Sequence, residues 1–263
     1  MLSYQHIYHA GNLADVQKHA LLAWVLAYLT QKDKPLTYME THSGRGLYEL
    51  NAPEALRTGE AAAGIQRVRQ AGWFYADHPL ERAIRAVQKR HGAEAYPGSP
   101  MIAASILRDQ DSLHLAELHP QEHAALATMM SPYGAKVYRQ DGFELAQSLL
   151  PPTPRRGVLM IDPSYEVKSE YDRLPGVISK LHRKWNVGVI VLWYPVLRDD
   201  RHSAMISALK SQNLPKSVCH EVRFDPVREG HGMVGSGMFI VNAPFGIENE
   251  ATRLTRLFET LRN

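Results

Sequence analysis

Residues 157–165 read Gly157-Val158-Leu159-Met160-Ile161-Asp162-Pro163-Ser164-Tyr165, a short apolar run that stops at an Asp-Pro pair. A run of this length, partly β-branched, predicts a strand buried in a parallel sheet. The Asp-Pro pair then lies at the carboxyl edge of that sheet, where open α/β folds bind their ligands. The stretch therefore predicts an α/β fold with a ligand site that begins at Asp162.

The groups that follow this strand suit a flat base that carries an exocyclic amine. The Asp162 carboxylate and the Pro163 carbonyl can each accept one amine hydrogen, and Tyr165 is expected to stack on the base. Asp-Pro-Ser-Tyr resembles the Asp-Pro-Pro-Tyr motif of S-adenosylmethionine-dependent amino-methyltransferases, with Ser164 in place of the second proline. Asp-Pro-Ser is also common in a type I turn after a strand, so the four residues alone leave both interpretations open.

The composition is that of an ordinary globular protein. The chain has 263 residues, 44% hydrophobic and 22% charged, enough for one α/β domain or a domain with an insertion. The single Cys219 cannot form an internal disulfide, and we find neither a signal peptide nor an apolar run near the roughly 20 residues of a membrane span. We expect a cytoplasmic protein. The net charge of +3 permits a nucleic-acid partner but is well below that of a dedicated binder.

The N-terminal ten residues are rich in aromatic and histidine side chains, and a helix is expected to follow. Asn12 is a good helix cap, and the apolar spacing predicts a helix from about residue 13 to residue 30. The pair His6 and His9 has no cysteine or carboxylate spaced to complete a metal site, so we expect no bound metal.

Acidic residues and glycines follow three further predicted strands. Strand 36–41 runs into His42-Ser43-Gly44-Arg45-Gly46, strand 113–118 carries Glu117, and strand 135–140 precedes Asp141-Gly142. In nucleotide-binding α/β folds, such glycines allow close approach of the backbone and such acids hold ribose hydroxyls. A nicotinamide or flavin enzyme shares these features but does not need Asp-Pro-x-Tyr after a fourth strand. The combination favours methyl transfer over hydride transfer.

Residues 48–98 interrupt this alternation and are predicted to form short helices, about 55–68 and 80–90, with nothing strand-like. Seven basic residues occur there: Arg57, Arg67, Arg69, Arg82, Arg85, Lys89 and Arg90. In the second helix Leu80, Ile84 and Val87 should face the core, while Arg82, Arg85 and Lys89 line another side. That side can contact RNA phosphates, although a solvated helix face has the same pattern. The cluster 180–184 and the loop 225–235 are further candidates for RNA contact.

The rest of the chain continues the alternation of strand and helix, and no internal repeat occurs. We expect helices at 119–130, 143–150, 172–185, 201–212 and 249–262, and strands at 187–193, 217–224 and 236–243.

Four longer motifs resemble the ribosomal large subunit methyltransferase J family over essentially the full chain. They are Tyr4-Gln-His6-x-x-His9-Ala-Gly11-Asn12-x-x-Asp15-Val-x-Lys18-His19, Glu40-Thr-His42-Ser-Gly44-x-Gly46, Tyr96-Pro97-Gly98-Ser99-Pro100 and Ile161-Asp162-Pro163-x-Tyr165-Glu166. The resemblance implies a Rossmann-like S-adenosylmethionine-dependent methyltransferase with a mostly parallel seven-stranded sheet. Residues 1–47 and 99–263 would form this domain, and 48–98 an inserted helical subdomain. The implied reaction is methylation of N6 of one adenine, adenine 2030, in 23S ribosomal RNA by a monomer.

The resemblance also implies roles for individual residues. The cofactor S-adenosylmethionine would contact His19, His42, Ser99, Glu117, Asp141, Gly142 and Asp162. Asp162 would also be catalytic beside Pro163 and Tyr165, while Tyr4, His6 and Lys18 would position the adenine or close the N-terminal arm. Because an adenine amine is too weak an acid for a carboxylate to deprotonate, Asp162 is expected to orient and polarise it.

Three alternatives stay open. A DNA adenine methyltransferase shares the motif but usually carries a larger target-reading domain than the roughly 50 residues inserted here. Protein glutamine methyltransferases usually begin their motif with Asn, whereas this chain has Asp162. A non-catalytic RNA-binding protein on the same fold is the third.

Overall fold

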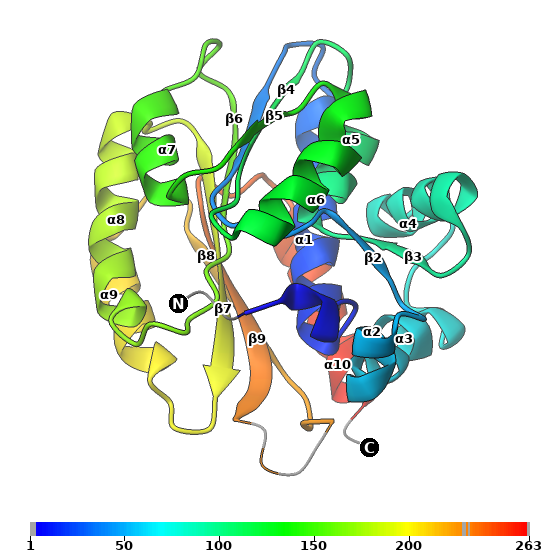
Figure 1. Cartoon of the computed structure of the whole chain (residues 1–263). Helices are drawn as coiled ribbons and strands as arrows, with labels where there is room; N and C mark the ends of the chain where they lie inside the picture. Colours follow the sequence, from blue (N-terminus) through cyan, green and yellow to red (C-terminus); the bar gives the residue numbers. More distant parts are fainter. Residues whose placement is uncertain (1–3, 228–229, 231, 262–263) are drawn as a thin grey trace.

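The protein folds around a seven-stranded sheet with helices on both faces, seen in a computed structural model that describes residues 4–227, 230 and 232–261 (Figure 1). The strand order is β5 (Lys136–Tyr138), β4 (Ser112–Ala116), β1 (Thr37–Glu40), β6 (Gly157–Ile161), β7 (Val189–Leu197), β9 (Met233–Val241) and β8 (Val218–Arg223). β9 runs antiparallel to both neighbours, and the other pairs are parallel. The predicted α/β class with a mostly parallel sheet is confirmed.

The strand β6 is buried on both faces, as its continuous apolar sequence predicts. Val158 and Met160 belong to the core on one face, and Leu159 and Ile161 to the core on the other. The order of strands reverses between β1 and β6, whose chain connections lead to opposite sides of the sheet. This reversal leaves a crevice at the carboxyl ends of the two strands, directly beside Asp162.

The helices divide between the two faces. The cores show α1 (Leu13–Thr30), α5 (Ser99–Ile106), α6 (Pro120–Met130) and α10 (Ile247–Glu259) on one side, and α7 (Gly142–Leu149), α8 (Glu170–Lys184) and α9 (His202–Ser211) on the other. The predicted helix at 13–30 is confirmed, and the Asn12 side chain caps it by accepting from the Asp15 N–H. Predicted residue 262 of the last helix lies outside the described residues. None of the described helices combines the length and apolarity that crossing a membrane requires.

The inserted segment contains helices but is not wholly helical, which corrects our expectation. It comprises β2 (Leu47–Glu49), α2 (Pro53–Thr58), the π-helical turn η2 (Ala62–Gln66), α3 (Arg67–Gln70), α4 (Pro79–His91) and β3 (Ala95–Pro97). The two strands pair antiparallel at the neck of the insertion. Each has three residues and its partner is far along the chain, so no local periodicity reveals them. Helix α5, which directly follows, was not predicted either.

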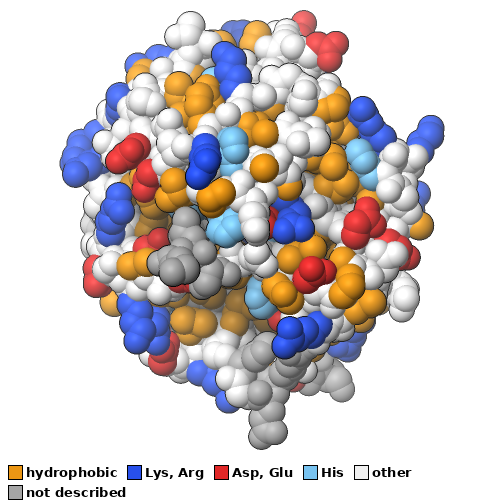
Figure 2. Space-filling view, viewed as in Figure 1, with side chains coloured by type: hydrophobic (Ala, Val, Ile, Leu, Met, Phe, Trp, Pro, Cys, Tyr) orange, Lys and Arg blue, Asp and Glu red, His pale blue; other side chains and the backbone are white. Residues whose placement is uncertain are grey.

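Helix α4 has the two faces that its sequence predicts. Leu80, Ile84 and Val87 are buried, whereas Arg82, Arg85 and Lys89 are exposed. Figure 2 shows that basic side chains on the face in view are scattered among acidic and apolar ones rather than gathered into a single patch. Any contact with a polyanion on this face must therefore draw on separate groups of basic residues.

Candidate active site

One cavity of about 380 Å³ lies at the carboxyl edge of the sheet and collects nearly all the predicted site residues. Its lining includes Tyr4, His6, Lys18, His19, His42, Ser99, Glu117, Asp141, Gly142, Asp162 and Pro163. Tyr165 does not line it. Parallel strands that end at the same edge bring His42, Glu117, Asp141 and Asp162 together. Most of the other residues come from the N-terminal segment and from helices α1 and α5, which lie beside that edge.

The glycine loop after β1 is tied to Glu117, just beyond β4. The Glu117 carboxylate accepts from the Gly44 N–H at 2.8 Å and from the His119 N–H at 2.7 Å. Burial raises the pKa of Glu117 above its ordinary value. Each carboxylate oxygen accepts one backbone N–H and has a second lone pair free. Glu117 can therefore also accept hydrogen bonds from the two hydroxyls of a ribose.

Asp141 and Gly142 form the next part of the wall. Asp141 Oδ1 caps α7 by accepting from the Phe143 and Glu144 N–H groups at 2.8 Å and 3.1 Å. A Cβ on Gly142 would lie 1.9 Å from the Thr41 carbonyl oxygen. This position therefore requires glycine because the loop after β5 passes directly against the end of β1.

The residues in this half of the cavity fit S-adenosylmethionine. The Ser43 hydroxyl lines the cavity, is buried and has no hydrogen-bond partner among the described residues. Glu117 offers carboxylate oxygens for ribose hydroxyls, and His42 presents an imidazole whose pKa is lowered to about 4 by burial, so the ring is neutral. The neutral ring of His42 can pack against a purine, and the Ser43 hydroxyl can form a hydrogen bond with the polar edge of that purine.

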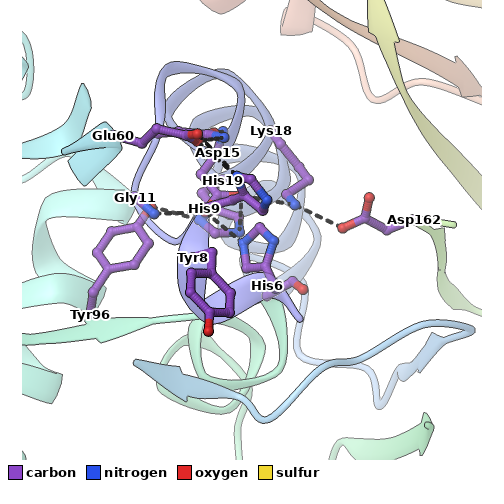
Figure 3. Close-up of polar contacts among 12 residues, drawn as sticks. His6, Tyr8, His9, Gly11, Asp15, Lys18, His19, Glu60, Tyr96 and Asp162 are labelled. Carbon is purple, nitrogen blue, oxygen red and sulfur yellow. Dashed lines mark hydrogen bonds and ion pairs between the residues drawn. The ribbon is translucent and has the colours of Figure 1, made fainter. Parts of the chain in front are cut away.

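The half of the cavity that contains Asp162, which we call the reacting half, holds a partly buried ion pair (Figure 3). Lys18 Nζ, reaching out from α1, lies 2.8 Å from Asp162 Oδ2 and 2.9 Å from Asp15 Oδ1. Burial alone would lower the pKa of Lys18, but the two carboxylates raise it above its ordinary value. The ammonium therefore stays charged and fixes one oxygen of Asp162, leaving Oδ1 to accept from a substrate.

The N-terminal arm, residues 4–12, continues this network toward the cavity mouth. The Tyr4 hydroxyl lies 2.8 Å from His6 Nδ1, and His6 Nε2 lies 2.9 Å from Asp15 Oδ2. Burial alone would raise the pKa of Asp15, but His6 and Lys18 hold it well below its ordinary value. Asp15, which we did not assign to the site, is thus the anion around which the arm and Lys18 are arranged.

His19 lies deeper than the other histidines and is almost wholly buried. Its Nδ1 lies 2.8 Å from the Tyr96 hydroxyl, and burial lowers its pKa to about 3. The ring is therefore neutral at physiological pH and can serve as a hydrogen-bonding group, not as a cation.

Ser99 also lines the cavity and donates its hydroxyl to Glu40 Oε1. Glu40 ends β1, is 1% exposed and accepts a second hydrogen bond, of 3.0 Å, from the Tyr38 hydroxyl. Burial raises the pKa of Glu40 to about 8, and the nearby Asp162 carboxylate contributes to the rise. A largely protonated carboxyl group thus lies beneath the cavity floor at neutral pH.

The structure does not place Tyr165 where we predicted a stacking face. The backbone at Tyr165 is left-handed (φ 57°), and its ring packs against Tyr171 and Trp193 in the hydrophobic core. Its hydroxyl donates to the Trp193 carbonyl at 2.7 Å. In this conformation the ring lies behind the cavity wall and supports it. Burial of the ring in the core offsets the free-energy cost of the left-handed backbone at Tyr165.

Trp193 supplies the aromatic surface instead, and the sequence analysis did not single it out. It lines the cavity, and Lys18 Nζ lies 5.2 Å from the centre of its ring. Its indole N–H donates to Ser236 Oγ at 2.9 Å, which fixes the orientation of the ring. Trp193 is the last residue of the predicted strand 187–193 and precedes Tyr194-Pro195, and that position was the available signal. In the structure β7 continues to Leu197, but Leu192 pairs with Ile161, so Trp193 lies level with Asp162.

The candidate RNA contacts lie in different places relative to the cavity. Helix α8 lines the cavity with Glu170 and Arg173 in its first turns, whereas the cluster 180–184 follows at its far end. Ten residues of helix separate Glu170 from Lys180, about 15 Å. The cluster therefore lies toward the amino edge of the sheet, away from the cavity mouth. In the loop 225–235, residues 228, 229 and 231 lie outside the described residues.

Comparison with known proteins places this site in a family. The model of the family described as "Ribosomal RNA large subunit methyltransferase D, RlmJ" matches residues 33–261. The chain belongs to this family. It is 40% identical to ribosomal RNA large subunit methyltransferase J of Escherichia coli (strain K12) over 95% of this chain and 90% of that protein. It is 37% identical to the Haemophilus influenzae protein of the same name, with the same coverage of both chains.

A solved structure agrees with this membership. The crystal structure of a protein from Legionella pneumophila (strain Philadelphia 1) is similar, with a TM-score of 0.84 and 37% identity. The match covers 96% of this chain and 94% of that one. As a member of the family the chain is an enzyme, an S-adenosylmethionine-dependent methyltransferase with a Rossmann-like fold.

Proposed function

We propose that this enzyme methylates N6 of one adenine in 23S ribosomal RNA, adenine 2030 by family resemblance, before ribosomal proteins cover the site. The relatives' names state the RNA class, and the wall formed by Asp162, Pro163 and Trp193 supports the adenine amine as the acceptor. The observation that carries the proposal is the Lys18–Asp162 ion pair, which holds a carboxylate beside the cofactor half of the cavity.

Asp162 acts by orientation. Its Oδ2 is bound to Lys18, so Oδ1 accepts one hydrogen of the amine while the Pro163 carbonyl accepts the other. Both contacts turn the nitrogen lone pair away from the ring and toward the donor. Bound S-adenosylmethionine would supply an electrophilic methyl group to that lone pair. Methylation makes the amine a strongly acidic cation, which can then give its proton to Asp162 Oδ1 or to water, so no strong base is required first.

The stacking role that we predicted for Tyr165 is proposed for Trp193. Trp193 lies on the cavity wall with its ring held by Ser236, whereas Tyr165 lies behind it. A base can reach this pocket only when it is unpaired or flipped out of a helix, which suits RNA free of protein. Tyr4 and His6 of the arm are proposed to contact the adenine from the mouth side.

We propose further that residues 1–47 and 99–263 act as the catalytic domain and 48–98 as an inserted subdomain that contacts RNA through Arg82, Arg85 and Lys89. The exposure of these three side chains supports the contact. We infer a monomer without bound metal that works in the cytoplasm. Among the described residues, no three His, Cys, Asp or Glu side chains are grouped to hold a metal ion.

The test is incubation with tritiated S-adenosylmethionine and deproteinised ribosomal RNA, followed by nucleoside analysis. We expect label in N6-methyladenosine, and we expect Asp162→Ala to abolish it while the variant still unfolds cooperatively in urea. Asp109→Ala, a change at an exposed carboxylate in the loop before β4 that does not line the cavity, is the matched control. Labelling of duplex DNA instead would favour the DNA enzyme. Failure to bind S-adenosylmethionine would favour a non-catalytic RNA-binding protein.

A further inference from the structure

The inserted segment 48–98 holds the N-terminal arm as well as presenting basic residues to solvent. The Thr58 hydroxyl donates to the Tyr8 carbonyl at 2.6 Å, and the Ile65 N–H donates to the Gly11 carbonyl at 2.7 Å. A Cβ on Gly64 would lie 2.2 Å from that same carbonyl oxygen, so the two backbones are in direct contact. The arm is thus docked on the insertion through its backbone at Tyr8 and Gly11.

Glu60 is the charged residue in this contact. Its side chain is 5% exposed, and both its oxygens lie 3.1 Å from His9 Nδ1. One of these oxygens also accepts from Asn12 Nδ2 at 3.1 Å. Burying a carboxylate costs free energy unless hydrogen-bond partners compensate. The contacts of Glu60 to His9 and Asn12 therefore hold the arm and the inserted segment in one relative position.

Two short routes connect Glu60 to the reacting groups, and Figure 3 labels Glu60, His9 and Lys18 among their members. In the first, the His9 ring stacks on Tyr4 with centroids 5.6 Å apart, and Tyr4 is hydrogen-bonded to His6 in the cavity wall. In the second, Asn12 caps α1 through the Asp15 N–H at 2.8 Å, and Asp15 holds Lys18. Both routes end at side chains that line the cavity beside Asp162.

We propose that Glu60 is a positioning residue for methyl transfer: by holding His9 and Asn12, it sets the arm in place over the reacting half of the cavity. The inserted subdomain then contributes to the chemical step and not only to RNA affinity. This inference rests on the proposed function, because ribosomal RNA is the substrate of its assay. The competing explanation is that Glu60 only stabilises the junction between insertion and domain.

Glu60→Ala and Glu60→Gln separate these explanations when kinetics and stability are measured together. Glu250→Gln is the matched control: Glu250 is also buried and also ties the insertion to the domain, through His78 at 3.2 Å, but contacts neither arm nor cavity. Steady-state methylation of ribosomal RNA, cofactor affinity by calorimetry and urea unfolding are measured for each. A positioning role affects kcat, because misplacement by about 1 Å can cost up to about a hundredfold.

We expect Glu60→Ala to lower kcat by about tenfold or more, with changes below about threefold in KM for RNA and in cofactor affinity. Glu60→Gln keeps one acceptor oxygen and should recover part of the loss. His9→Ala and Glu60→Ala combined should cost no more than the larger single effect, since both remove one contact. Glu250→Gln should lower stability without lowering kcat.

Three results would overturn the proposal. They are a wild-type kcat in Glu60→Ala, an equal loss of kcat in Glu250→Gln, or additive losses in the His9 and Glu60 double variant. If the wild-type enzyme itself fails to label ribosomal RNA, the proposed substrate is wrong. That result tests the substrate alone, because it uses only the wild-type enzyme. The role of Glu60 is tested separately, by comparing its variants with the wild type.

Discussion

In the wild-type protein we expect the free energy of unfolding to fall as the pH rises from 6 to 8. Replacing Glu40 by Gln should remove this pH dependence. Glu40 is buried at the end of β1 between the Ser99 and Tyr38 hydroxyls, and its pKa is raised from 4.5 to about 8. A carboxyl group with a raised pKa in the folded state stabilises the fold while protonated. That contribution is complete below the unfolded pKa and is lost as the pH rises through the folded pKa.

The magnitude follows from the two pKa values. Between 4.5 and about 8 the folded state binds one more proton than the unfolded state, so the free energy of unfolding falls by about 1.4 kcal/mol per pH unit. Integrated from pH 6 to pH 8, and allowing for partial ionisation near the upper value, the loss is about 2 kcal/mol. Glutamine resembles the protonated form and should not show this loss.

Other groups titrate with the opposite sign or in another range. His19 and His42 have pKa values lowered to about 3 and about 4, so they cost stability as the pH falls below 6.5. Wild type and Glu40→Gln both carry these histidines, so their contribution cancels in the difference between the two proteins. That difference therefore isolates Glu40 from pH 6 to pH 8.

Urea unfolding, followed by tryptophan fluorescence at several pH values from 6 to 8, provides the measurement. We expect the wild-type free energy of unfolding to fall relative to the variant by about 2 kcal/mol across this range. The reasoning about the buried carboxyl group is refuted if the two proteins keep a constant difference at every pH. Cofactor affinity should weaken over the same range in the wild type alone, because ionised Glu40 changes the hydrogen bond to Ser99.

Three further predictions concern the cavity and the exposed face of α4. Gly142→Ala places a methyl group 1.9 Å from the Thr41 carbonyl, so calorimetry and urea unfolding should show weaker cofactor binding and a stability loss of about 1–3 kcal/mol. Trp193→Ala should reduce kcat/KM for RNA by roughly tenfold to a hundredfold through lost stacking, whereas Trp193→Phe should retain most of it; equal losses would remove the stacking role. Arg82→Glu with Lys89→Glu should raise KM for RNA and flatten its salt dependence, while Lys180→Glu with Arg183→Glu, at the far end of α8, should not.

Much of the architecture could be predicted from periodicity alone. The buried strand at 157–161, the capped helix at 13–30 and the two faces of α4 follow from patterns that depend on neighbouring residues. Such patterns arise from burial and helix capping, and both depend on residues that are close together in the sequence. The two strands at the neck of the insertion could not be predicted this way, because each depends on a partner about 50 residues away.

The sequence by itself determined the class of fold, the edge of the sheet at which the cavity lies and the position of Asp162 at that edge. Those features depend on strand ends and motifs that are contiguous in the chain. Only the tertiary structure decided which side chains face the cavity: it turned Tyr165 into the core, brought Trp193 to the wall and paired Lys18 with Asp162. The direction of a loop side chain depends on packing and charge from distant segments, and no local pattern encodes the balance between them.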